Sequence, residues 1–207
     1  MKLLIGTPTY NHQLDSRMVT TVIDIIKEAD KRNVALNWDR PCSCLLAYNR
    51  NLIVQRALDE EFDWLLFIDA DTSADGGEFP FQMIETAFKY DTAIVGAPVM
   101  LKFPGKKAWN FCYKKPEGYK NWEGDLPKFP IEADVIGTGI MLIKVDFLKK
   151  MKPPWFRQTE TYNEELKQPG FFPEDYNLCE LAKEMGQKII VDTNVKTSHH
   201  GDFTFTL

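Results

Sequence analysis

The first hundred residues alternate short apolar runs with longer segments whose apolar residues recur at helical spacing. Met18, Val22 and Ile25 mark an apolar stripe at i, i+4 and i+7, which predicts an amphipathic helix. Residues 64–68 are apolar at every position, which is typical of a strand covered on both faces. The pattern predicts strands at 3–5, 34–38, 64–68 and 92–96, and helices at 18–29, 46–58 and 81–90.

Strands without alternation that are joined by helices indicate an α/β protein with a mostly parallel sheet, flanked by helices. In such sheets ligands bind at the carboxyl ends of the strands. The second half of the chain is less regular. There we expect an edge strand at 109–113, an apolar run at 135–143, a long loop at 153–170, a helix at 173–185 and a strand at 188–192.

Composition narrows the function classes. The chain has 207 residues, of which 44% are apolar, and 30 acidic against 25 basic side chains give a net charge of −5. This is typical of one soluble domain, and mild acidity argues against a nucleic-acid partner. The apolar run at 3–5 is too short for a signal or a membrane segment. The four cysteines lack paired zinc spacing, so we expect reduced thiols and a cytoplasmic protein, in the host cytoplasm if viral.

An acidic pair directly follows the most apolar strand. Asp69-Ala70-Asp71 places two carboxylates at the mouth of a buried strand, where they suit a hard divalent cation. Such a cation can also neutralise the charge of a departing nucleoside diphosphate. The alternative is that the aspartates only end the strand and begin a turn. A second alternative is a haloacid-dehalogenase-like phosphatase, although its motif usually follows the first strand and here Ser73, not Thr or Val, stands two residues after Asp71.

Two further groups are predicted to face inward. At 100° per residue Arg50 lies on the apolar arc of its helix, so it needs an anionic or carbonyl partner. A bound diphosphate or Asp69 could serve, and the alternative is a structural ion pair with another carboxylate. Glu174 and Asp175 follow Pro173 at the start of a helix. They either complement the helix dipole or belong to a functional site. By helical position, Glu174 is slightly better centred on the inward face than Asp175.

Taken in order, these segments resemble the GT-A-fold glycosyltransferases, in particular the inverting family-2-like group in its compact viral, phage and bacterial forms. The resemblance extends over nearly the whole chain. It rests on Gly6-Thr7-Pro8-Thr9-Tyr10-Asn11, Arg50-Asn51, the run from Phe62 to Thr72, Gly137-Thr138-Gly139, Pro173-Glu174-Asp175 and Ser198-His199-His200-Gly201.

The resemblance implies a single catalytic domain over 1–207, with a nucleotide-binding half at 1–97 and an acceptor-side half at 98–207. It assigns Asp175 as the catalytic base, with Glu174 as the alternative. It assigns the metal to Asp71, Asp69 and a late histidine, for which the His-x-Gly pattern selects His199 over His200. The implied donor-binding residues are Thr7, Pro8, Thr9, Asp39, Arg50, Asp69, Ala70, Asp71 and Gly139.

Adjacent residues of an extended segment point to opposite faces, so only one of His199 and His200 is expected to enter the site. Imidazole beside carboxylates suits Mn²⁺, with Mg²⁺ as the alternative. The expected activity is transfer of a sugar, a hexose or deoxyhexose, from a nucleotide-diphosphate donor such as a UDP-sugar to a hydroxyl of a glycan, glycoprotein or other acceptor. A non-catalytic nucleotide- or carbohydrate-binding module is the remaining alternative.

Overall fold

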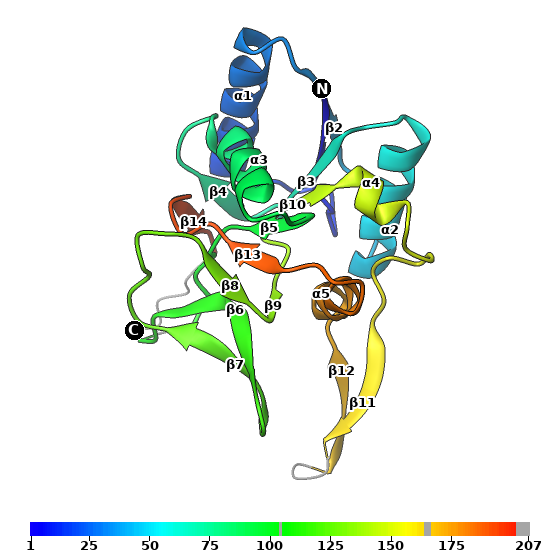
Figure 1. The fold of residues 1–207 in the computed structure, drawn as a ribbon, viewed down its shortest axis with the longest axis vertical. Helices are drawn as coiled ribbons and strands as arrows, with labels where there is room; N and C mark the ends of the chain where they lie inside the picture. The colour runs from blue at the N-terminus through cyan, green and yellow to red at the C-terminus, as the bar shows by residue number, and fades with distance from the viewer. Residues whose placement is uncertain (104, 164–166, 202–207) are drawn as a thin grey trace.

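The computed structural model describes residues 1–103, 105–163 and 167–201, and its centre is one mixed sheet of seven strands (Figure 1). The strands lie in the order β2-β1-β3-β10-β5-β13-β8. Five of them point the same way, while β10 and β8 are antiparallel to their neighbours. Their bounds are β1 Lys2–Gly6, β2 Ala35–Asp39, β3 Trp64–Ile68, β5 Ile94–Gly96, β8 Ile131–Ala133, β10 Ile140–Lys144 and β13 Ile189–Val191.

Helices cover both faces of this sheet, as the apolar runs predict. Alternate residues of β1 face opposite cores: Leu3 and Ile5 pack with α1 and α3, whereas Leu4 packs with α2, α4 and α5. The helices are α1 Ser16–Lys31, α2 Leu46–Asp59, α3 Phe79–Lys89, α4 Val145–Leu148 and α5 Glu174–Glu184. No helix of the described residues is long and apolar enough to cross a membrane.

Three small sheets lie outside the central sheet. The first has the order β7-β6-β9, and the other two are the pairs β14-β4 and β11-β12. The β11–β12 hairpin projects beyond α5 (Figure 1). The strands are β4 Thr72–Ala74, β6 Ala108–Lys115, β7 Gly118–Glu123, β9 Val135–Ile136, β11 Thr159–Asn163, β12 Gln168–Phe172 and β14 Thr197–His199.

Two expectations for the second half are wrong. The strand expected at an edge, β6, is the middle strand of its sheet, because β7 pairs with one side and β9 with the other. The segment 153–170 is not a loop throughout, since β11 pairs with β12 from Thr159↔Phe172 to Asn163↔Gln168. Thr-Glu-Thr-Tyr-Asn and Gln-Pro-Gly carry no apolar alternation, so periodicity does not reveal this hairpin.

Candidate functional site

A cavity of about 260 Å³ lies at the carboxyl ends of the central strands and is lined by both halves of the chain. Four of its lining residues are assigned a site role from the sequence, namely Asp69, Gly139, Asp175 and His199. The other lining residues are Thr72, Val99, Leu101, Asn110, Gly137, Thr138, Pro173 and Tyr176. Residues separated by up to 130 positions therefore meet at the edge where parallel sheets bind ligands.

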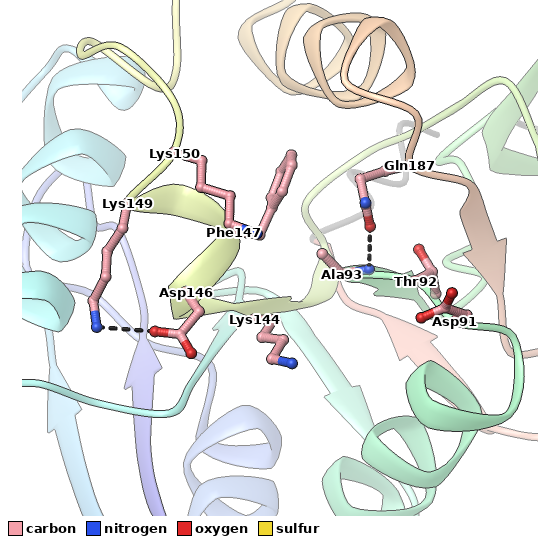
Figure 2. Close-up of a pocket in the computed structure, with 9 residues that line it drawn as sticks. All are labelled: Asp91, Thr92, Ala93, Lys144, Asp146, Phe147, Lys149, Lys150 and Gln187. Carbon is pink, nitrogen blue, oxygen red and sulfur yellow. Dashed lines mark hydrogen bonds and ion pairs between the residues drawn. The ribbon is translucent and has the colours of Figure 1, made fainter.

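A larger cavity of about 510 Å³ lies at the opposite end of the sheet (Figure 2). It is found where β10 ends at Lys144 and β5 is about to begin at Ala93. Some of its lining residues bind one another: Lys149 Nζ is 2.9 Å from Asp146 Oδ1, and the Gln187 side chain accepts the Ala93 N–H at 2.8 Å. No residue proposed from the sequence lines it, so the smaller cavity is the candidate site.

Arg50 joins the end of β3 to the start of α5. Its guanidinium is 2% exposed; Nη2 donates to Asp69 Oδ1 at 3.1 Å and Nη1 donates to Glu174 Oε1. The Phe156 ring lies 5.8 Å from the guanidinium carbon. The sequence prediction that Arg50 faces inward toward an anionic group is confirmed. Two carboxylates from different elements share one buried cation, which fixes the relative position of these elements.

Asp175 and its neighbour Glu174 have different surroundings. Glu174 is bound to Arg50 and its side chain is 12% exposed. Asp175 lines the cavity, and burial raises its pKa from 3.8 to about 6, with Glu174 and Asp69 adding to the rise and Arg50 opposing it. The N–H groups of Tyr176, at 2.9 Å, and Thr138, at 3.4 Å, donate to the Asp175 carboxylate. The geometry thus leaves Asp175 as the carboxyl group that faces the cavity with near-neutral pKa.

Asp71 lies close to His199 beside the cavity; His199 lines the cavity and Asp71 does not, and we call this pair the rim. His199 Nε2 is 3.4 Å from Asp71 Oδ2, and His199 Nδ1–H donates to the Met100 carbonyl at 2.8 Å. Burial raises the pKa of Asp71, but hydrogen bonds from His199 and Lys102 outweigh burial and hold it at about 2. The hydrogen bond to Asp71 in turn raises the pKa of His199. This rim combines a carboxylate oxygen and an imidazole nitrogen of fixed orientation.

His200 points elsewhere. Its Nε2 lies 2.7 Å from Ser73 Oγ, its side chain is buried, and burial lowers its pKa. β14 ends at His199, and the N–H of His200 donates to the Asp71 carbonyl at 2.8 Å, as in an extended chain whose adjacent side chains alternate. Of the two histidines only His199 lines the cavity, and its role in a functional site stays a prediction.

Within the part of the chain that the structure describes, no group of three or more His, Cys, Asp or Glu side chains is arranged to hold a metal ion. Asp69, although it lines the same cavity, is turned toward Arg50. The protein thus offers two close candidate ligands, Asp71 and His199, and further ligands would have to come from a bound substrate or water.

The segment after β1 is buried rather than open to the cavity. The Thr7 hydroxyl accepts the Trp38 indole N–H at 3.0 Å, and the Thr9 hydroxyl donates to the Pro41 carbonyl at 3.1 Å. Pro8 is buried between them. The two hydroxyls thus link the segment after β1 to the end of β2. None of the three residues lines the 260 Å³ cavity.

Asp39 and Ala70 also lie outside the cavity lining. Asp39 Oδ1 is 3.2 Å from Arg56 Nη1, and the Ala70 carbonyl accepts the Asp15 N–H at 2.9 Å. Gly139 is at the cavity wall, where a Cβ would lie 3.1 Å from the Val99 side chain. Its lack of a side chain lets β10 approach the segment after β5 closely.

Sequence reasoning did not assign four other residues of this region. The buried hydroxyls of Thr72 and Thr138 have no hydrogen-bond partner among the described residues, and both residues line the cavity. Asn110, another lining residue, donates through Nδ2 to the Gly137 carbonyl at 3.2 Å. Lys102 Nζ lies 2.6 Å from Asp71 Oδ2. Thr72 and Thr138 belong to segments on which the family resemblance rests, whereas no motif or periodicity in the sequence points to Asn110 or Lys102.

Comparisons with known proteins give a fold but no sequence family. No protein-family model and no curated protein matches the chain. The solved A197 protein from STIV has a TM-score of 0.64 and 22% identity, over 98% of this chain and 87% of that one. GalNAc-T7, solved with UDP, GalNAc and Mn²⁺, has a TM-score of 0.59 and 11% identity, over 96% of this chain and 44% of that one.

A third similar structure is a glycosyltransferase involved in glycosylation of the major capsid of PBCV-1. Its TM-score is 0.52 at 12% identity, and the match covers 99% of this chain and 95% of that one. These likenesses show that the chain has a GT-A-like fold, as the ordered motifs predicted. At these identities they describe architecture, so the chemistry must be argued from the cavity itself.

Proposed function

We propose that this protein is a glycosyltransferase that moves a sugar from a nucleotide-diphosphate donor, most simply a UDP-sugar, to an acceptor hydroxyl with inversion. One observation carries the proposal: Asp175, with a pKa of about 6, shares a 260 Å³ cavity with Asp69 and His199 at the carboxyl ends of the strands. The fold and the UDP and Mn²⁺ bound to GalNAc-T7 support the choice of donor and metal.

Asp175 would take the proton from the acceptor hydroxyl. A carboxyl group with a pKa of about 6 is ionised at neutral pH, yet it is a stronger base than an ordinary aspartate. Two backbone N–H groups hold it in place, from Thr138 and Tyr176. Glu174 is the weaker candidate because the guanidinium of Arg50 already binds it.

Asp71 and His199 fit a divalent cation. The Met100 carbonyl accepts the Nδ1 proton of His199, and Nε2 lies 3.4 Å from Asp71 Oδ2. Once the Nε2 proton is released, its lone pair would be free to bind a cation beside Asp71. A nitrogen and oxygen pair suits Mn²⁺ better than Mg²⁺. When bound, the ion would supply positive charge to the leaving diphosphate. His200, bonded to Ser73, would not belong to this ligand set.

Arg50 would act through the carboxylates that it holds. With 2% exposure and a carboxylate on each terminal nitrogen, it keeps Asp69 and Glu174 in place at the donor side and the base side of the cavity. Residues 1–97 would bind the nucleotide. The backbone groups of Thr7, Pro8, Thr9, Ala70 and Asp39 would form part of this nucleotide site. Residues 98–207 would receive the acceptor, a glycan, a glycoprotein or another hydroxyl compound.

Turnover of nucleotide sugars tests the proposal. Release of nucleoside diphosphate from a panel of UDP-, GDP- and dTDP-sugars is measured with Mn²⁺ and a mixture of oligosaccharide acceptors. We expect turnover with one class of donor, and a loss of about a thousandfold in Asp175→Asn, because general bases contribute this much. Glu132→Gln, an exposed carboxylate on β8, is the matched control and should behave like wild type. Full activity of Asp175→Asn would reject the assignment.

A further inference from the structure

Lys102 forms an ion pair with Asp71, the carboxylate that the proposed metal would bind. Lys102 Nζ lies 2.6 Å from Asp71 Oδ2, the same oxygen that His199 Nε2 approaches at 3.4 Å. The side chains of Lys102 and Asp71 are 39% and 47% exposed, so both can change partners without unpacking the core.

The position of the Lys102 side chain is defined by packing against Gly201. A Cβ on Gly201 would come within 3.3 Å of Lys102 Cδ and Cε and 3.4 Å of its Nζ, so the lysine stem lies against the bare backbone of Gly201. The preceding residue, Leu101, is tied to β6 through its N–H, which donates to the Ala108 carbonyl at 2.8 Å.

The same short segment also orients the imidazole. Met100 accepts the Nδ1–H of His199 at 2.8 Å, and Lys102 comes two residues later. One stretch of backbone therefore fixes the nitrogen ligand and supplies a cation to the oxygen ligand. A sequence change that moved this segment would disturb both.

An ammonium group and a divalent cation compete for one carboxylate oxygen. With the lysine nitrogen at 2.6 Å from Asp71, a metal ion on the same oxygen would stand close to a like charge, which is strongly repulsive. The ion must therefore displace Lys102. The displaced ammonium remains tethered beside the site, where an anion bound to the metal would attract it.

We propose that Lys102 is a resident counter-ion of the Asp71–His199 pair and a ligand of the donor diphosphate. Before the donor arrives, it neutralises Asp71 and weakens metal binding. When metal and nucleotide bind together, it moves from Asp71 to the diphosphate. This inference rests on the proposed function and adds that metal and donor bind cooperatively, through Lys102.

Mn²⁺ affinity tests the inference without any turnover. Free Mn²⁺ is measured by electron paramagnetic resonance during titration of the wild-type protein, Lys102→Met and the control Lys106→Met, each with and without UDP. Lys106 is exposed in the same segment. Without UDP, Lys102→Met should bind Mn²⁺ about fivefold more tightly, the factor expected for loss of one competing surface charge pair. The factor by which UDP strengthens Mn²⁺ binding should be smaller in this variant, and Lys106→Met should match wild type.

Two results would overturn the role of Lys102: Mn²⁺ binding by Lys102→Met without UDP that is unchanged or weaker, or an undiminished effect of UDP. Asp71→Asn separates this failure from failure of the proposed function. If the wild type binds Mn²⁺ and UDP through Asp71 but Lys102→Met behaves identically, only the lysine inference fails. If Asp71→Asn leaves Mn²⁺ binding unchanged and UDP has no effect on wild type, the proposed donor site fails as well.

Discussion

Replacing Arg50 by Met tests how the cavity is held together. The guanidinium is 2% exposed and binds carboxylates on two elements, Asp69 after β3 and Glu174 in α5. Met fills much of the same volume but leaves both carboxylates without their cation. Removing one partner of a buried ion pair costs about 3–5 kcal/mol. For a chain of this size, the melting temperature should fall by about 10 °C.

Urea denaturation followed by tryptophan fluorescence measures the free energy of unfolding. Arg56→Met is the matched control in the same helix, because Arg56 is 36% exposed and pairs with Asp39 and Glu60. Loss of such exposed pairs should cost less than about 1 kcal/mol. The double variant Arg50→Met/Glu174→Met removes one of the stranded charges and should recover part of the loss. Equal destabilisation by Arg50→Met and Arg56→Met would refute the claim that Arg50 organises the site.

The remaining predictions concern protonation and the metal. Because Asp175 must be ionised to act, the turnover rate should rise with pH through about 6 and then level off; a flat pH–rate profile would exclude this base. Its pKa is raised in the fold from 3.8 to about 6, so its contribution to stability is present at low pH and lost as pH rises through 6. Asp175→Asn should consequently stabilise the protein by up to about 3 kcal/mol at pH 7.5 and by less than about 1 kcal/mol near pH 4, as measured by urea denaturation at both pH values. His199→Gln should weaken Mn²⁺ binding at least tenfold, whereas His200→Gln, whose ring lies against Ser73, should leave it unchanged; equal effects would reject His199 as the ligand.

The sequence predicts the central sheet and its acidic edge well, because burial on both faces leaves a strong local signal. The apolar run of β3 and the stripe of α1 appear as expected, and Asp69 follows directly after β3. The inward direction of Arg50 also follows from helical periodicity. Helical periodicity does not reveal which carboxylates bind Arg50, because one of them, Glu174, is 124 residues away in the chain.

The second half of the chain is harder to predict for physical reasons. β4 and β14 have three residues each, and they are held by pairing with each other across more than 120 positions rather than by a pattern of their own. Lys102 lies in a segment rich in Pro, Gly and Lys that resembles an ordinary solvated turn. Its side chain contacts Asp71 and lies against the bare backbone of Gly201, and only the folded chain brings these residues together.

Parallel calorimetry and turnover on Asp175→Asn test the central claim most directly, namely that this carboxylate acts on the acceptor beside a bound nucleotide sugar. The account predicts that the variant binds the donor with Mn²⁺ within about twofold of wild type while turnover falls about a thousandfold. A parallel loss of donor affinity and turnover would contradict it, because Asp175 would then serve the donor site and not the proton transfer.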